Sequence, residues 1–322
     1  MSTARSFFKL PILFTLINYV LLRIGHLVML WFSSGFRAED FQSGFMARFI
    51  FNSMASTLHE LFIYFVIVAI ACYYAKLHEV TKRNIVIILI GAICATILNL
   101  LLTFFWKSAG LLLFNTLSLL SQSWIVLTTV ITLTTWLFYL TSLMLVALLI
   151  FFLLRWCVRS EQQTSSLFEM NAANLSIIHN MLFSGTIVAL FMYFVTAIPN
   201  YIFPTYSDDL VHFVLVLLCL LLISGLHLFF IYFFVQPCFS QSYSTLQIIR
   251  LLKSIGIIVG ILCVAMFITI IVIEVIFYLY LADQGFEIMI PFMIASFTAL
   301  LVVYYVILLT CSRFAVRRYF SV

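Results

Sequence analysis

The sequence predicts an all-α integral membrane protein: a polytopic helical bundle with about eight transmembrane helices, in a single membrane domain over residues 1–322. Its 322 residues are 65% hydrophobic and only 8% charged, and the mean hydropathy is +1.23. A water-soluble fold could not cover this composition with a polar surface. The apolar residues form long continuous runs instead of alternating with polar ones, so the spans should be helices and not barrel strands.

Eight apolar runs are long enough to cross a bilayer as helices. In chain order, the expected spans lie near 11–32, 57–75, 85–106, 124–154, 175–203, 209–236, 254–281 and 286–312. The region 111–123 is ambiguous, because it suits an interfacial segment as well as part of a span. The distribution of Lys and Arg decides how many spans the region 111–154 contributes.

The basic residues of the loops and tails gather on one side of this topology. With one span over 124–154, that side holds twelve: Arg5, Lys9, Lys76, Lys82, Arg83, Arg155, Arg159, Arg250, Lys253, Arg313, Arg317 and Arg318. The other side holds three: Arg37, Arg48 and Lys107. A further span would exchange the two sides for every loop after residue 154. The cytoplasmic side would then hold five Lys and Arg residues and the other side ten. Because short cytoplasmic loops are enriched in Lys and Arg, we expect a bacterial inner membrane protein with a cytoplasmic N-terminus and C-terminus.

Charge and motif content exclude several function classes. The formal net charge of +5 is interpreted as membrane orientation and attraction to anionic lipid headgroups, because no basic patch with interleaved exposed aromatics suits a nucleic acid. The seven cysteines include no Cys-x-x-Cys pair and neither His-Glu dipeptide continues to a second His, so we expect no metal and no cofactor. No catalytic signature is present, so an enzyme is the less favoured class.

Arg23 is the most informative residue of the first span. It lies about 18 Å from the start of that span, close to the middle of a hydrocarbon layer roughly 30 Å thick. Tyr19, Arg23 and His26 follow the i, i+4, i+7 spacing of one helical face, which must turn away from lipid. Arg23 needs an acidic partner there. Glu274, the one acid well inside a span, and Glu60, near the start of the second span, are the two alternatives.

A second polar stripe precedes and enters the second span. Arg48, Asn52, Ser56 and His59 repeat at one-turn spacing, with Glu60 beside them. Together with the face of the first span, this stripe predicts an outward-facing polar cavity for an anionic or zwitterionic headgroup. The alternative is an interfacial helix whose polar edge meets lipid headgroups, with one structural ion pair behind it. The candidate substrate-binding residues are Arg23, His26, Arg48, His59, Glu60 and Glu274.

Small and hydroxylated residues at one-turn spacing indicate helix packing. Small side chains let helix backbones approach closely in lipid, and Thr hydroxyls can bond to the carbonyl one turn earlier on their own helix. We expect intramolecular packing from these positions, with oligomerisation as the alternative. The residues concerned are Gly91 and Ala95, Gly256 and Gly260, and the stripe Thr128, Thr132 and Thr135.

The stretch FQSGFMARFIF over residues 41–51, which follows a first span containing Arg23, resembles the start of the second helix in two related families. These are the membrane domains of the extracytoplasmic phosphoglycerol-transferase and phosphoethanolamine-transferase families. The acidic residue expected just after Arg48 and Phe49 is absent, and the soluble catalytic domain of those families has no counterpart in this chain. The resemblance implies the membrane part of a phospholipid headgroup transferase-like protein that lacks the catalytic domain.

These features favour a transporter, flippase or lipid-binding component of the bacterial cell envelope. The expected partners are membrane lipids and an amphipathic or anionic small molecule, with a homo-oligomer or an envelope protein as further options and no nucleic acid. The alternative is a membrane-embedded enzyme acting on a lipid-linked substrate, which would need the candidate residues to converge. A heptahelical receptor is disfavoured, because its odd number of spans would place the two termini on opposite sides.

Overall fold

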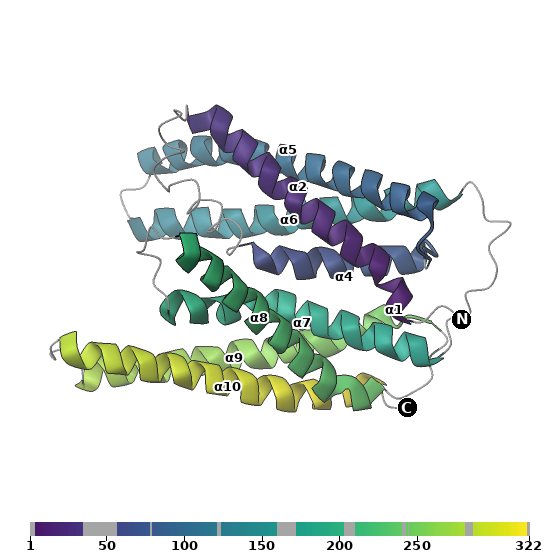
Figure 1. Cartoon of the computed structure of the whole chain (residues 1–322). Coiled ribbons are helices and arrows are strands. Elements are labelled where there is room, and N and C mark those ends of the chain that lie inside the picture. Colours follow the sequence, from purple (N-terminus) through teal and green to yellow (C-terminus); the bar gives the residue numbers. More distant parts are fainter. Residues whose placement is uncertain are drawn as a thin grey trace. The chain divides into compact units, whose positions relative to one another are not determined.

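The computed structural model describes residues 4–34, 57–77, 79–120, 124–159, 172–202, 210–239, 243, 245–280 and 286–320. Every regular element in these ranges is a helix, so the all-α prediction is confirmed for them (Figure 1). The helices are α1 (Ala4–Phe7), α2 (Lys9–Ser34), α4 (Leu58–Tyr74), α5 (Lys82–Leu120), α6 (Trp124–Arg159), α7 (Ala172–Ile202), α8 (Leu210–Val235), the 3₁₀ turn η2 (Gln236–Phe239), α9 (Ile248–Tyr280) and α10 (Phe286–Phe320).

Within the described ranges, seven helices are long and apolar enough to cross a membrane, which is the architecture of a multi-pass membrane protein. The segments that meet this criterion are Lys9–Met29, Lys82–Leu113, Leu133–Cys157, Ala173–Phe191, Leu217–Phe239, Ile248–Leu279 and Ile294–Phe320. The remaining helix at a predicted span is α4, which is apolar but only 17 residues long. Large apolar side chains such as Phe105 and Phe267 are 65% exposed, as expected where lipid is the solvent.

Helix boundaries follow from the residues at the ends of the apolar runs. Pro11 lies in the first turn of α2 and Pro237 follows the end of α8, where the missing proline N–H costs no helical hydrogen bond. The ambiguous region after residue 111 continues α5 as helix as far as Leu120. At 39 residues, α5 is about 58 Å long, so it exceeds the thickness of the hydrocarbon layer.

By their contacts the helices form two compact units, and the single membrane domain over 1–322 stays a prediction. Unit 1 comprises Met1–Phe168 and Val188–Ser224, and unit 2 comprises Glu169–Ile187 and Gly225–Val322. Helices α7 and α8 each contribute residues to both units.

Contacts between side chains fix the helix directions in unit 1. Helix α2 runs parallel to α5 and antiparallel to α4, whereas α6 runs antiparallel to α5 and parallel to α4. The pairs that establish this are Phe14 with Gly91, Asn18 with Thr96, Phe8 with Phe65, Arg23 with Glu60, Arg83 with Cys157, Trp106 with Phe138, His59 with Tyr139 and Tyr74 with Phe151. Consecutive helices of unit 1 therefore alternate in direction.

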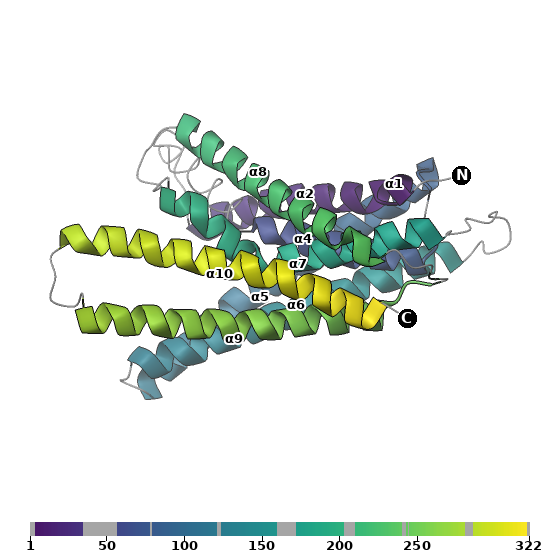
Figure 2. The same cartoon turned by 90° about the horizontal axis from the view of Figure 1, so that it is seen from below.

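The same alternation holds in unit 2. Helices α7 and α8 are antiparallel, α8 is parallel to α10, and α9 and α10 form an antiparallel hairpin whose helices lie side by side in both views (Figures 1 and 2). The pairs that fix these directions are Ser176 with Phe239, Asn180 with Tyr232, His227 with Tyr304, Phe234 with Arg313, Arg250 with Tyr319 and Phe277 with Phe292.

Candidate functional site

The polar face predicted on the first span is present on α2. Tyr19 and Arg23 are buried, at 7% exposure each, and His26 is partly buried one turn further along. Arg23 lies 14 residues beyond Lys9, at which both α2 and its apolar segment begin. That is about 21 Å along the helix axis, deep within the span. A charge at this depth requires a partner or a polar surrounding.

The partner of Arg23 in the structure is Glu60. Arg23 Nη2 and Glu60 Oε2 are 2.9 Å apart, and the two side chains are 8% and 16% exposed. Glu60 belongs to the first turn of α4, where the partial positive charge of the helix N-terminus stabilises a carboxylate. The other partner considered from the sequence, Glu274, is on α9 in unit 2, where it is exposed and forms no hydrogen bond or ion pair with any residue that the structure describes.

Neutral polar side chains from α4, α5 and α6 extend the site around the ion pair. Tyr64 is one turn beyond Glu60 on α4. Asn99 Nδ2 of α5 donates a 2.6 Å hydrogen bond to the hydroxyl oxygen of Tyr64. His59, also on α4, has its Nε2 atom 3.3 Å from Tyr139 Oη of α6. We call these residues, with the α2 face, the unit 1 polar cluster: Tyr19, Arg23, His26, His59, Glu60, Tyr64, Asn99 and Tyr139.

Two features of the unit 1 polar cluster bear on ligand binding. The Arg23 guanidinium carbon lies 5.2 Å from the centre of the Tyr19 ring, a cation–π contact that holds the cation on the helix face. His26 Nε2 is buried and has no hydrogen-bond partner among the described residues. A buried polar atom without a partner costs free energy, so a ligand group that bonds to His26 Nε2 would recover that cost.

The structure brings together four of the six candidate binding residues: Arg23, His26, His59 and Glu60. Arg48 falls in 35–56 and so lies outside the described residues, and Glu274 belongs to unit 2. The low exposure of Arg23 and Glu60 makes the pair occluded in this conformation. An outward-facing cavity at this position therefore stays a prediction.

The packing residues have different environments. Gly91 and Ala95 are buried, and a Cβ atom at Gly91 would lie 3.2 Å from the Phe14 ring, so this pair does face a neighbouring helix. Gly256 and Gly260 are exposed on α9, and a Cβ atom there would meet no heavy atom within 4 Å. They therefore make no close helix contact with the described residues, unlike the expected packing.

The hydroxyl stripe of α6 is described only in part. Thr135 Oγ1 donates a 2.7 Å hydrogen bond to the Ile131 carbonyl one turn earlier, which is how a threonine is accommodated in lipid without an interhelical partner. The side chains of Thr128 and Thr132 lie outside the described residues. Where the chain is described, no group of three or more His, Cys, Asp or Glu side chains is close enough to hold a metal ion.

Sequence reasoning missed the polar contacts of α5. Asn99 bonds to Tyr64, and Thr96 Oγ1 lies 2.9 Å from Asn18 Oδ1 of α2. A signal was present, because Asn99 lies one turn beyond Ala95 and two turns beyond Gly91, on the face already assigned to helix packing. Comparison of the chain with protein-family models, with curated proteins and with solved structures returned no match.

Proposed function

We propose that the chain crosses the membrane eight times, with both termini in the cytoplasm of a bacterial cell. The alternating directions of α2, α4, α5 and α6 support this count. Helix α4 leads the chain from the C-terminal end of α2 back to the N-terminal end of α5. At 17 residues, α4 is about 26 Å long, close to the thickness of the hydrocarbon layer. The excess of Lys and Arg on the side of the termini supports the orientation.

The function that we propose is transport, flipping or binding of a lipid or other amphipathic molecule in the cell envelope, with the unit 1 polar cluster as the headgroup site. The buried Arg23–Glu60 pair carries this proposal. Replacing a buried ion pair with packed apolar side chains is often neutral or stabilising, so fold stability alone is a weak reason to keep one. Ionisable groups inside a span are rare and mark substrate and ion pathways, so such a pair is a candidate functional site.

The chemistry of the pair favours a zwitterionic headgroup. A phosphate oxygen can replace Glu60 on the Arg23 guanidinium, and the ammonium group of the same headgroup can take the carboxylate that is released. This exchange brings no net charge into the low-dielectric site, whereas a singly charged anion would bring one. His26 Nε2 is placed on the same face of α2 to accept or donate one further hydrogen bond to the headgroup.

The test measures headgroup binding and lipid translocation by the full chain. Dihexanoylphosphatidylethanolamine is titrated calorimetrically into the purified protein, and the transbilayer movement of a fluorescent phosphatidylethanolamine is followed in proteoliposomes. The Arg23→Gln/Glu60→Gln pair removes both charges together and so leaves no buried unpaired charge. We expect it to weaken binding about tenfold or more, since hydrogen bonds to charged groups contribute about 1.5–3 kcal/mol.

The matched control is Glu274→Gln, which removes the carboxylate of a span outside the cluster and should leave binding unchanged. Unchanged binding and translocation in the Arg23→Gln/Glu60→Gln protein would contradict the proposal that the unit 1 polar cluster is the headgroup site. Binding without translocation in the wild type would narrow the function to a lipid-binding component.

A further inference from the structure

A second concentration of charge lies in unit 2, where α9 begins and α10 ends. Its five basic residues are Arg250 and Lys253 on α9 and Arg313, Arg317 and Arg318 on α10. The acidic residues in the described parts of these two helices are Glu274 and Glu287. Glu274 is about 32 Å from Lys253 by helix counting, several times the Debye length of about 8 Å at physiological salt. The acids of the hairpin therefore do not neutralise its basic end.

Contacts within unit 2 hold Arg313 and Arg250 in place. Arg313 Nε donates a 3.0 Å hydrogen bond to the Phe234 carbonyl, and its guanidinium carbon lies 3.6 Å from the centre of the Phe234 ring. On α9, Arg250 Nη1 donates to the Tyr319 carbonyl at 3.4 Å. Neither contact neutralises charge, because the acceptors are neutral carbonyls and a ring. Arg313 and Arg250 are therefore held in place by neutral groups, and their charges remain.

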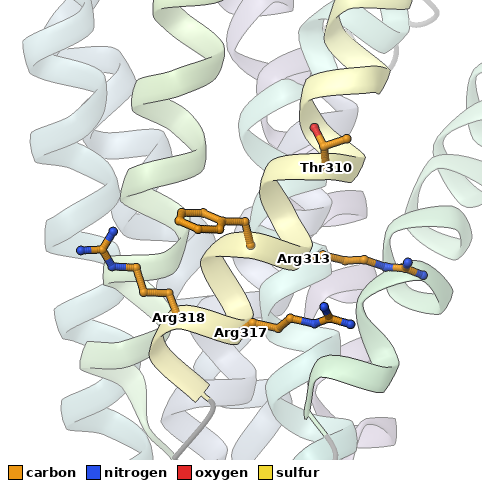
Figure 3. Close-up of a pocket in the computed structure, with 5 residues that line it drawn as sticks. Thr310, Arg313, Arg317 and Arg318 are labelled. Atoms are coloured by element: carbon orange, nitrogen blue, oxygen red, sulfur yellow. The ribbon is translucent and has the colours of Figure 1, made fainter.

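The surface of α10 is hollowed at the same end. A hollow of ≈ 470 Å³ is lined by Thr310, Arg313, Phe314, Arg317 and Arg318. Arg313 and Arg317 extend to the same side of α10 and Arg318 to the other side (Figure 3). Arg317 and Arg318 are exposed, and the Phe314 ring is 56% exposed. Along α10 the exposed side chains thus change from apolar at Val302 and Val306 to cationic at Arg317 and Arg318.

This gradient matches an anionic phospholipid standing at the end of a membrane span. We propose that the hollow binds the phosphate of a phospholipid with net negative charge, through Arg317 and Arg318 and in the field of the fixed Arg313. The acyl chain then lies along Phe314 and the apolar part of α10. Thr310 contributes little, because its hydroxyl already donates to the Val306 carbonyl at 2.6 Å. Basic pockets at the membrane surface select such headgroups, and this proposal is independent of the headgroup site in unit 1.

The experiment compares lipid binding by three forms of the full chain. Native mass spectrometry counts adducts of phosphatidylglycerol and of phosphatidylethanolamine on the wild type, on R317Q/R318Q and on R317K/R318K. The control is K82Q/R155Q, which removes two exposed basic residues from unit 1. We expect R317Q/R318Q to bind phosphatidylglycerol about tenfold more weakly or worse, since two charged hydrogen-bond donors are lost. The Lys pair should lose part of the affinity, because Lys cannot grip a phosphate with two parallel donors.

Each outcome supports or overturns the proposal. Selective loss of phosphatidylglycerol in the Gln pair, with the control unchanged, supports it. Equal losses in the Gln pair and in K82Q/R155Q would show a diffuse charge effect and overturn it. Displacement of the bound lipid by equimolar inorganic phosphate would also overturn it, because the occupant would then be a free anion. The melting temperature of the Gln pair in phosphatidylcholine nanodiscs verifies that the protein is folded.

Discussion

His179 Nε2 accepts a hydrogen bond from the backbone nitrogen of Gln247, at 2.8 Å. Its Nδ1 atom is 2.8 Å from the Leu175 carbonyl, so the neutral tautomer with the proton on Nδ1 satisfies both contacts. Gln247 precedes α9, whose first N–H groups have no acceptor within the helix. His179 thus caps α9 from α7, and its ring also contacts Phe239 and Phe320. One side chain connects four elements of unit 2.

We predict that His179→Phe destabilises the protein. The Phe ring can keep the aromatic contacts, but the Gln247 N–H loses its acceptor in a partly buried position, which costs about 1–3 kcal/mol. The free energy of unfolding of the purified protein in mixed micelles measures this loss. Ile249→Phe is the matched control, because Ile249 is 71% exposed. Equal stability of His179→Phe and the wild type would show that the cap contributes nothing.

The Arg23–Glu60 contact predicts strong coupling between the two residues. Arg23→Leu leaves a buried carboxylate without a partner, and Glu60→Leu leaves a buried guanidinium, so each should cost about 3–5 kcal/mol. The double variant should be more stable than either single one, because neither charge remains. A double-mutant cycle on the free energy of unfolding measures the coupling. The cycle of Arg23→Leu with Glu274→Leu should be additive, and additivity in both cycles would contradict the pairing.

Much of the fold could be predicted because a helix that crosses lipid must be a long apolar run, which is visible in the sequence. Each of the eight predicted apolar runs coincides with a described helix. The discrepancies lie at the ends, where charged residues were interpreted as loops. Helix α9 begins at Ile248, before Arg250 and Lys253, and α10 continues through Arg317 and Arg318 to Phe320. Apolarity reports where the hydrocarbon layer ends, whereas a helix can continue into the headgroup region.

The site was predictable only within each helix. Periodicity placed Tyr19, Arg23 and His26 on one face of α2, because the helix repeat alone decides which residues share a face. It could not decide which helix lies opposite, so Glu60 and Glu274 stayed as alternatives. Asn99 was missed because a neutral amide costs far less in a span than a charge does, so it stands out less in the sequence.

We predict a small cost for removing the hydroxyl of Tyr64. Tyr64→Phe breaks the hydrogen bond to Asn99, and such interhelical bonds in membrane proteins contribute about 0.6 kcal/mol on average and at most about 1.7. The change in the free energy of unfolding should fall in that range. Tyr74→Phe is the control, because Tyr74 is 50% exposed and should change stability less. A loss above about 3 kcal/mol would mean that Asn99 cannot find another partner.

We predict that His26→Phe separates stability from ligand binding. Phe fills the same space without the buried Nε2 atom that lacks a partner, so stability should stay unchanged or rise. Headgroup affinity should fall about tenfold, because one hydrogen bond to the ligand is lost from an occluded site. Calorimetry measures the headgroup affinity, and unfolding of the same preparation measures the free energy of unfolding. A parallel fall of both would assign His26 a structural role instead.

The antiparallel packing of α2 and α4 predicts the sidedness of three exposed positions in unit 1. If α4 is a complete crossing, Lys9→Cys and Glu79→Cys lie on the cytoplasmic side, and Thr116→Cys at the far end of α5 lies outside. In a background without the native cysteines, a membrane-impermeant maleimide should label only Thr116→Cys in intact cells. Permeabilised cells should label all three.

Arg155→Cys serves as the control, because the contact between Arg83 and the Cys157 carbonyl puts the end of α6 beside the start of α5. Labelling of Glu79→Cys, but not Lys9→Cys, in intact cells would mean that α4 does not cross, and the chain would then have seven spans.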